Sequence, residues 1–175
     1  EIAVSFEVRD LATTALEDLT TGAPLVTASA FFDLASAAFI RKIARACSTH
    51  RAGFYAALTY NGLQRWAPHR PADSQITAAF NRHQMSDKGF GPAAGPEAAS
   101  LLADQFRLEG YSVLEGESPW KLGANDRMLI AELQRGQAMA VLDMNALDAK
   151  TVETWVKTIR SAAEIGHTDT FAVPA

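Results

Sequence analysis

Short blocks of apolar residues, separated by polar turns, predict alternating strands and helices over the first third of the chain. Residues 2–8, 25–28 and 53–60 (GFYAALTY) have the short apolar runs that are typical of strands. Between them, apolar residues at helical spacing predict a helix at 11–19 and a second helix that begins after the capping residue Ser36. These blocks favour strand–helix–strand units.

The next stretch, residues 63–96, departs from this rhythm. It holds Pro68, Pro71, Pro92 and Pro96, and its one amphipathic segment, residues 74–85, follows Asp73. A long, irregular insertion between regular elements is usually functional. We therefore expect a lid or a substrate wall here.

Regular elements return in the second half of the chain. The pattern predicts, in order, a helix at 97–109, a strand at 111–115, a long helix capped by Asn125 or Asp126, a helix after Asp148 and a strand at 167–173. The whole succession favours an α/β fold with a mainly parallel sheet. The last strand is short and follows a helical excursion, so we expect it to pair antiparallel at or near an edge.

Composition narrows the class of protein. The 175 residues, 48% of them hydrophobic, suffice for one core, and 20 acidic against 16 basic side chains give a net charge of −4. This balance disfavours a nucleic-acid or anionic-membrane surface that acts through bulk positive charge. The single Cys excludes an internal disulfide framework and suits a reducing compartment. The sequence thus predicts a soluble cytoplasmic domain.

Candidate chemistry lies at the carboxyl ends of the predicted strands, where parallel sheets bind ligands. Asp10 follows the first strand, and it either hydrogen-bonds a nucleoside or caps the next helix. Ala28 and Ser29 follow the second strand and are small enough for a ligand to approach closely. The four His are scattered without metal-ligand spacing, so no metal site is predicted.

A serine hydrolase is one alternative. Ser29, Asp143 and His167 occur in the order of an α/β-hydrolase triad, with Asp169 as another possible acid. Thr27 and Phe31 flank the serine where that strained turn requires glycine, which argues against this alternative. The chain also contains no phosphate-binding glycine loop.

Four stretches carry a resemblance to a known family: residues 25–34 (LVTASAFFDL), 57–62 (ALTYNG), 83–92 (HQMSDKGFGP) and 166–169 (GHTD). In this order they resemble the latter two-thirds of a class I S-adenosylmethionine-dependent methyltransferase, of a bacterial group without a defined substrate. The resemblance implies a single methyltransferase-like domain over residues 1–175, with an insertion at 63–96. Its fold would be Rossmann-like, with helices on both faces of the sheet.

The resemblance also assigns the strands. Residues 2–8 look like the third strand of the family and residues 25–28 like the fourth, while 53–60, 111–115 and 167–173 look like the fifth, sixth and an antiparallel seventh. The family's glycine-rich cofactor loop would precede Glu1. We therefore expect an N-terminally incomplete domain that by itself binds S-adenosylmethionine weakly.

Site residues follow from the same resemblance. Asp10 and Leu11 would lie near the adenine of S-adenosylmethionine, and Ala28 and Ser29 along its amino-acid side. His83 is the candidate base because its ordinary pKa is near neutral, although a packing role on the helix face is equally open. The wall for the methyl acceptor would come from Tyr60, Asn61, Trp66, Lys88 and Phe90.

The identity of the methyl acceptor and the oligomeric state are left open by the sequence. A small molecule, a lipid or a protein would each suit the absence of a basic stripe. A second alternative from another class is a non-catalytic Rossmann-like module that binds a partner through the helices of residues 126–165.

Overall fold

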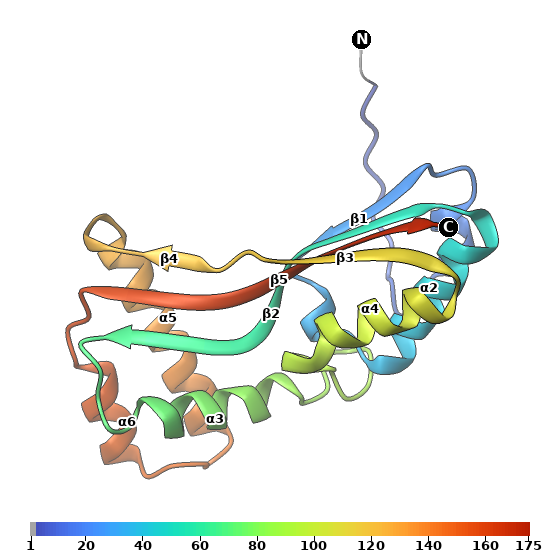
Figure 1. The fold of residues 1–175 in the computed structure, drawn as a ribbon. Helices are drawn as coiled ribbons and strands as arrows, with labels where there is room; N and C mark the ends of the chain where they lie inside the picture. The colour runs from blue at the N-terminus through green and yellow to red at the C-terminus, as the bar shows by residue number, and fades with distance from the viewer. Residues whose placement is uncertain (1–2) are drawn as a thin grey trace.

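The computed structural model describes residues 3–175, which build one five-stranded sheet and the helices packed against it (Figure 1). The strands are β1 (Leu25–Ser29), β2 (Gly53–Ala67), β3 (Tyr111–Glu117), β4 (Trp120–Leu122) and β5 (Ala162–Pro174). The α-helices are α1 (Leu16–Thr20), α2 (Ala37–His50), α3 (Asp73–Gln84), α4 (Ala98–Leu108), α5 (Arg127–Asp143) and α6 (Ala149–Val156). Three short 3₁₀ helices are η1 (Phe32–Leu34), η2 (Gly95–Glu97) and η3 (Ala124–Asp126).

The strand order is β1–β2–β5–β3, and β4 also pairs with β5. Only β1 and β2 are parallel, because β5 runs antiparallel to β2, β3 and β4. The predicted α/β class and the antiparallel final strand are confirmed, and β5 lies one strand in from the β3 edge. The prediction of a mainly parallel sheet is wrong. The long β5 pairs with three strands, so antiparallel ladders predominate.

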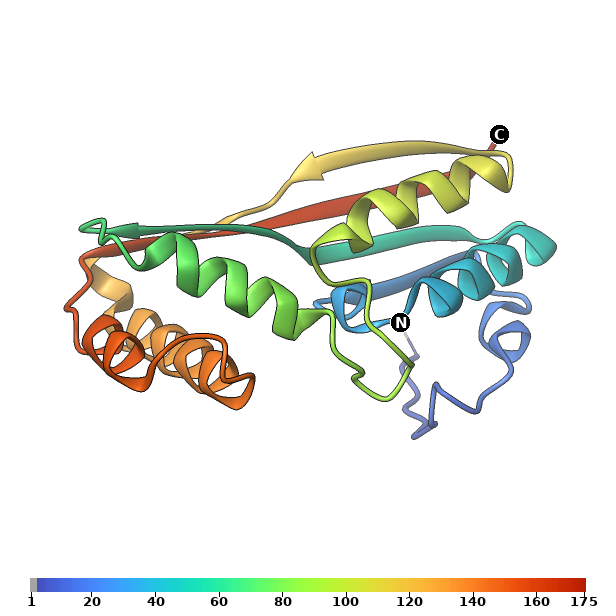
Figure 2. The ribbon, with the colours of Figure 1, turned by 90° about the horizontal axis from the view of Figure 1, so that it is seen from below.

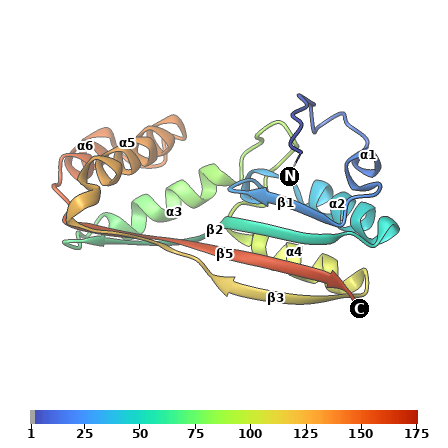
Figure 3. The same cartoon turned by 90° about the horizontal axis from the view of Figure 1, so that it is seen from above.

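The helices that cover the sheet lie on one face, not on both as the family resemblance implied. In Figures 1 and 2, α2, α3 and α4 are on the same side of the strands, and α5 packs beside α3. The other face is open when seen from above in Figure 3. Each connection between β1, β2 and β3 crosses this one covered face. Leu114 and Phe171, which are paired in register, are 71% and 38% exposed on the open face.

The predicted first strand is absent from the described residues. Ala3 to Asp10 have no regular secondary structure, and Phe6 is 95% exposed; Ile2 lies outside the described residues. Apolar alternation alone does not make a strand, since the backbone also needs a partner strand for its hydrogen bonds. The predicted helix at 11–19 is likewise reduced to the five residues of α1.

Other predicted boundaries are confirmed by their caps. The Ser36 hydroxyl accepts a hydrogen bond of 3.2 Å from the amide of Phe39 at the start of α2. The Asp148 carboxylate accepts one of 2.9 Å from the amide of Thr151 at the start of α6. These side chains satisfy amide groups that would otherwise lack a partner at the first turn of a helix.

Two apolar clusters make up the interior, and β2 runs through both. The first lies under α2 and α4, where Phe54 stacks on Phe106 at 4.3 Å between ring centroids. The second lies between the far half of β2 and α3, α5 and α6, around Trp66 and Trp155. β1 ends near the boundary between the clusters, because Ser29 pairs with Ala57 and β2 then continues to Ala67 paired only with β5.

Candidate functional site

A cleft of about 470 Å³ lies beyond the carboxyl end of β1, where β2 extends past its parallel partner. Its volume is within the range of small-molecule sites. The wall is formed by Asp33 of η1, by the strands β2, β4 and β5, and by the helices α3 and α5. Its lining residues are Asp33, Tyr60, Gln64, Phe80, His83, Gln84, Trp120, Glu132, Leu133, Gly136, Gln137, Ala140, Ile165 and His167.

The strand β2 is bulged where it passes the cleft. The register between β2 and β5 shifts after Ala56 and again after Tyr60, and Leu58 has a left-handed backbone with φ of 54°. Such bulges bend a strand and redirect its side chains. Asp169 holds the bulge, because its carboxylate accepts hydrogen bonds from the Leu58 amide at 2.8 Å and from the Tyr55 hydroxyl at 2.6 Å.

Two glycines allow the close approach that the bulge needs. Gly62 has φ of +85°, and a Cβ there would lie 2.9 Å from the Pro96 side chain. A Cβ at Gly166 would lie 2.7 Å from the Leu63 side chain and overlap the side-chain oxygen of Asn61. The dipeptide Asn61-Gly62 therefore lies within β2 as part of a bulge, and it is not the turn that ends the strand.

Tyr60 is fixed in the cleft wall by two hydrogen bonds. Its hydroxyl donates to Asn81 Oδ1 at 2.7 Å and accepts from Gln64 Nε2 at 2.7 Å. Burial is the largest cause that raises the pKa of Tyr60, with a contribution from the charge of Asp33. Tyr60 therefore stays protonated and offers an aromatic face to the cleft.

Three buried polar atoms of the wall have no hydrogen-bond partner among the described residues. They are Nδ1 of His83, Nδ1 of His167 and Oε1 of Gln137. His167 and Gln137 are only 8% and 4% exposed. A buried polar group without a partner destabilises a fold by about 1–3 kcal/mol. These atoms thus mark a place where a ligand would complete the hydrogen bonding.

His167 lies between aromatic rings, 5.2 Å from Trp120 and 6.3 Å from Tyr60 between centroids. Burial lowers the pKa of His167, and it outweighs the opposing effects of the Ile165 backbone and of Asp169. The imidazole is therefore neutral near pH 7 and is able to accept a proton.

Asp33 supplies a buried carboxylate to the cleft. The residue is 6% exposed and has no ion-pair partner in the part of the chain that the structure describes. Burial raises the pKa of Asp33, while hydrogen bonds from its own amide and the Tyr60 amide partly oppose that effect. A buried, unpaired carboxylate costs stability, so its retention suits a site better than a core.

Replacing Asp33 with asparagine is expected to raise the free energy of unfolding at pH 7, because it removes a carboxyl whose ionised form is disfavoured by burial. Because the pKa of Asp33 is higher in the folded than in the unfolded chain, its ionisation weakens the fold as pH rises through the raised pKa. The gain from Asp33→Asn should therefore shrink as pH is lowered toward 4. Urea unfolding at pH 7 and pH 5 measures this; a variant less stable than wild type at pH 7 would contradict it.

The structure brings together two of the predicted substrate-wall and base residues, Tyr60 and His83. Asn61 instead bonds Thr168 within the sheet, at 3.2 Å between Nδ2 and Oγ1. Trp66 is buried in the second cluster, edge-on to Trp155 at 5.4 Å between ring centroids.

Lys88 and Phe90 also lie outside the cleft, in the loop that joins α3 to η2. Phe90 packs edge-on against Phe31 and Phe39, at 5.5 and 5.0 Å between ring centroids. Lys88 is half-buried. Of the predicted insertion at 63–96, residues 63–67 belong to β2, residues 73–84 form α3 and η2 begins at Gly95, so only residues 68–72 and 85–94 are irregular.

The predicted cofactor residues fall in two places. Ala28 and Ser29 are the last residues of β1, with Ala28 half-buried and Ser29 exposed. Asp10 does not follow a strand; its carboxylate accepts a hydrogen bond of 2.9 Å from the Ala12 amide and closes a turn. Leu11 is half-buried against the first apolar cluster.

Sequence reasoning missed several residues of the cleft. Asp33 carried one signal, since a carboxylate between Phe32 and Leu34 directly after a strand is unusual for a core. As a candidate site residue, His167 entered only through the hydrolase alternative. Gln137 was not singled out and Trp120 was expected to pack in the interior, because their place in the wall depends on how α5 and β4 pack against β5.

The residues of the hydrolase alternative do not assemble. Ser29 and Asp143 are both exposed, neither lines the cleft with His167, and no hydrogen bond joins Ser29 to His167 in residues 3–175. The Asp169 carboxylate already accepts hydrogen bonds from the Tyr55 hydroxyl, the Leu58 amide and the Ser118 hydroxyl, the last at 2.5 Å. Burial would raise the pKa of Asp169, but these hydrogen bonds lower it.

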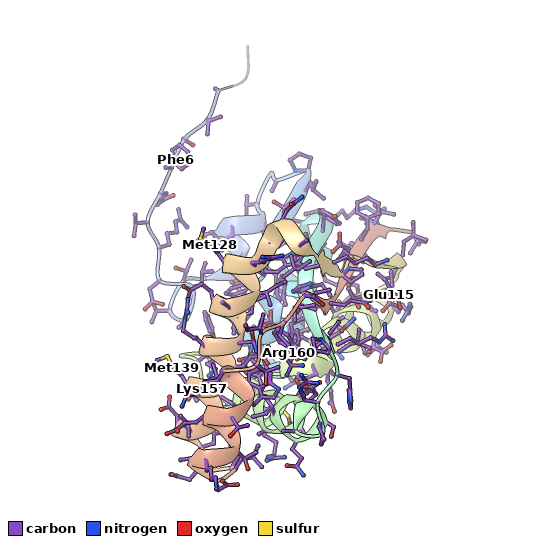
Figure 4. The ribbon with its side chains drawn as sticks, turned by 90° about the vertical axis from the view of Figure 1, so that its left-hand side faces the viewer. Phe6, Glu115, Met128, Met139, Lys157 and Arg160 are labelled. Carbon is purple, nitrogen blue, oxygen red and sulfur yellow. The ribbon has the colours of Figure 1, made fainter. Side chains whose placement is uncertain are left out.

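The surface on which the partner-binding alternative depends is partly apolar. Met128 and Met139 of α5 are 85% and 67% exposed, and Figure 4 shows them on the outer side of the helix. Between them, Glu132 and Arg135 form an exposed ion pair. Among residues 3–175, none covers these two side chains.

Comparisons with known proteins leave the chain without a family assignment. No model of a known protein family matches it, and a search of curated proteins found no match. Within residues 3–175, no helix is long and apolar enough to cross a membrane. The same residues contain no group of three or more side chains that could hold a metal ion.

Proposed function

We propose that the chain carries the acceptor-binding part of an S-adenosylmethionine-dependent methyltransferase, with the cleft at Asp33 and His167 as the acceptor site. The strand order β1–β2–β5–β3, in which β5 alone is reversed, is the observation that carries this proposal. The resemblance of the sequence to class I methyltransferases implies the same reversal, with an antiparallel final strand beside the strand at 111–115.

The place of the cleft supports the proposal. Ligands of α/β sheets bind beyond the carboxyl ends of parallel strands, and β1–β2 is the parallel pair here. The cleft begins at Asp33, four residues after β1 ends at Ser29. A methyl acceptor in the cleft and a methyl donor at the end of β1 would therefore be neighbours.

The residues at the end of β1 fit such a donor. Ala28 and Ser29 are small, and the exposed Ser29 leaves the strand end accessible. They would lie along S-adenosylmethionine, which supplies an electrophilic methyl group on a sulfonium sulfur. Asp10 fits less well, because the Ala12 amide already bonds its carboxylate.

The cleft residues would then position the acceptor and take its proton. Methyl transfer is an in-line displacement, so orientation and exclusion of water supply much of the catalysis. Tyr60, Phe80 and Trp120 provide apolar walls for this purpose. The neutral imidazole of His167 would accept a proton, with His83, the base predicted from the sequence, in the same cleft.

Calorimetry with S-adenosylhomocysteine on the full-length gene product tests the donor site. We expect binding, and we expect Ser29→Phe to weaken it at least roughly tenfold by filling the end of β1. Ser100→Phe, the same change at an exposed position on α4, is the matched control and should bind as wild type. Absence of binding by the wild-type protein would contradict the proposal.

A further inference from the structure

The charge of the cleft is one-sided. Its wall contains two carboxylates, Asp33 and Glu132, and no Lys or Arg. Glu132 forms an ion pair with Arg135 at the rim, which leaves Asp33 as the carboxylate without a cation. An anionic ligand would meet a negative charge at the base of the cleft with no counter-charge. A cationic ligand would supply the positive counter-charge that the Asp33 carboxylate lacks.

The open hydrogen-bonding positions favour a ligand that donates protons. Oε1 of Gln137 accepts hydrogen bonds only, is buried and has no partner in residues 3–175. The Asp33 carboxylate is also an acceptor when ionised. The unpartnered Nδ1 atoms of His83 and His167 can accept from a ligand in one tautomer.

Aromatic rings make up much of the remaining wall. Tyr60, Phe80 and Trp120 line the cleft, with the His83 ring stacked on Phe80 at 6.5 Å between centroids. Aromatic faces attract cations and pack well against flat apolar groups. The same chain uses this attraction in its interior, where the Arg160 guanidinium lies 5.4 Å from the Trp155 ring centroid.

We propose that the cleft binds an organic amine as its cation, with the ammonium group at Asp33 and Gln137 and an aromatic or apolar body against Tyr60, Phe80 and Trp120. That this amine is the methyl acceptor rests on the proposed function. The volume of about 470 Å³ suits a small molecule.

The group transfer balances as an N-methylation. The bound ammonium first gives one proton to the neutral imidazole of His167. The amine lone pair then forms the C–N bond with the methyl carbon of S-adenosylmethionine while the C–S bond breaks and its electron pair stays on sulfur. The products are a methylated ammonium, which keeps the positive charge that the sulfonium had, and neutral S-adenosylhomocysteine.

Three probes with one common body test the charge preference by calorimetry at pH 7. Phenethylamine is the cation, 2-phenylethanol is neutral and 3-phenylpropionate is the anion. We expect phenethylamine to bind at least roughly tenfold tighter than the alcohol, in line with one charge-assisted hydrogen bond, and the carboxylate to bind weakest. Equal or tighter binding of the alcohol or the carboxylate would overturn the inference.

Variants then locate the binding. Asp33→Asn should abolish the preference for the amine over the alcohol, whereas Asp104→Asn, an exposed carboxylate on α4, should leave it unchanged. Trp120→Ala provides a second variant at a more exposed position, 37% exposed, and should weaken all probes together. Unchanged amine preference in a folded Asp33→Asn protein, or unchanged affinities in Trp120→Ala, would place the ligand elsewhere.

The failure of this inference and that of the proposed function are separable. Amine binding at Asp33 without binding of S-adenosylhomocysteine would overturn the methyltransferase and leave the amine site in place. Binding of S-adenosylhomocysteine by a protein with no amine preference would overturn the amine site and leave the methyltransferase proposal in place.

Discussion

Replacement of Asp73 by alanine is expected to lower the free energy of unfolding by about 3–5 kcal/mol, because it leaves a buried guanidinium without its counter-charge. The Arg160 side chain is fully buried and donates to Asp73 Oδ1 at 2.6 Å. Asp73 also accepts from the Trp155 indole at 2.7 Å and from the Arg70 amide at 2.7 Å. This one carboxylate joins the start of α3, the end of α6 and the segment that enters β5.

The environment of Arg160 explains why the loss should be large. Its guanidinium lies between the Trp66 and Trp155 rings, at 5.7 and 5.4 Å from their centroids, and also donates to the Pro68 carbonyl at 2.5 Å. Figure 4 shows Arg160 toward the interior, while Lys157 lies near the surface. Water cannot easily replace Asp73 there, so the charge would remain uncompensated.

Urea unfolding of Asp73→Ala measures the effect. Asp104→Ala removes a carboxylate from an exposed ion pair with Arg107 and should change stability by less than about 0.5 kcal/mol. In a double-mutant cycle, Asp73→Ala with Arg160→Ala should cost less than the sum of the single changes, because each single change leaves its partner unpaired. A loss below about 1 kcal/mol for Asp73→Ala alone would contradict the account.

The same ion pair predicts a loss of stability in acid. Burial would raise the pKa of Asp73, but hydrogen bonds from Arg160, Arg70 and Trp155 lower it below the ordinary value. The stabilisation is therefore complete above the unfolded pKa of about 4 and is lost as pH falls through the lowered pKa. Asp73→Ala should be less sensitive to acid over this interval.

Replacement of Gly136 by tryptophan is expected to block the cleft and to weaken phenethylamine binding by roughly a hundredfold or more. Gly136 is exposed on α5, lines the cleft, and a Cβ placed there meets no atom within 4 Å. A large side chain can therefore enter the cleft without displacing the core. Calorimetry with phenethylamine measures the loss.

Gly136→Ala is the matched control. It should keep wild-type affinity and raise the free energy of unfolding by roughly 0.5–1 kcal/mol, because alanine favours the interior of a helix over glycine. Full binding by a folded Gly136→Trp protein would show that the amine does not occupy this cleft.

Periodicity predicted those elements whose side chains pack in a regular pattern. The helices α2, α4, α5 and α6 and the strands β1 and β3 were expected at nearly their observed positions, whereas β5 was expected only from residue 167, five residues after it begins at Ala162. Residues 3–8 have the same apolar alternation but pair with no strand, and sequence alone does not supply that partner. β4 was not expected, because three residues carry too little pattern.

The bulge within β2 shows why the site was harder to predict than the fold. Asn61-Gly62 has the composition of a turn, yet here it forms a bulge held by Asn61, Asp169 and the close approach of Gly166. A bulge changes the face of the sheet to which the following side chains point. Trp66 therefore packs in the second cluster, while Tyr60 lines the cleft. Tyr60 and His83 were expected in the wall, whereas Asp33 and Gln137 join it through tertiary packing.

The central claim is that the cleft beyond β1 receives the acceptor of a methyl transfer. The most direct test incubates the full-length gene product with S-adenosylmethionine labelled at its methyl group and with phenethylamine, and measures label in the amine. We predict transfer by the wild-type protein and by Gly136→Ala, and loss of transfer by Gly136→Trp. No transfer by any of the three, or equal transfer by all three, would contradict the claim.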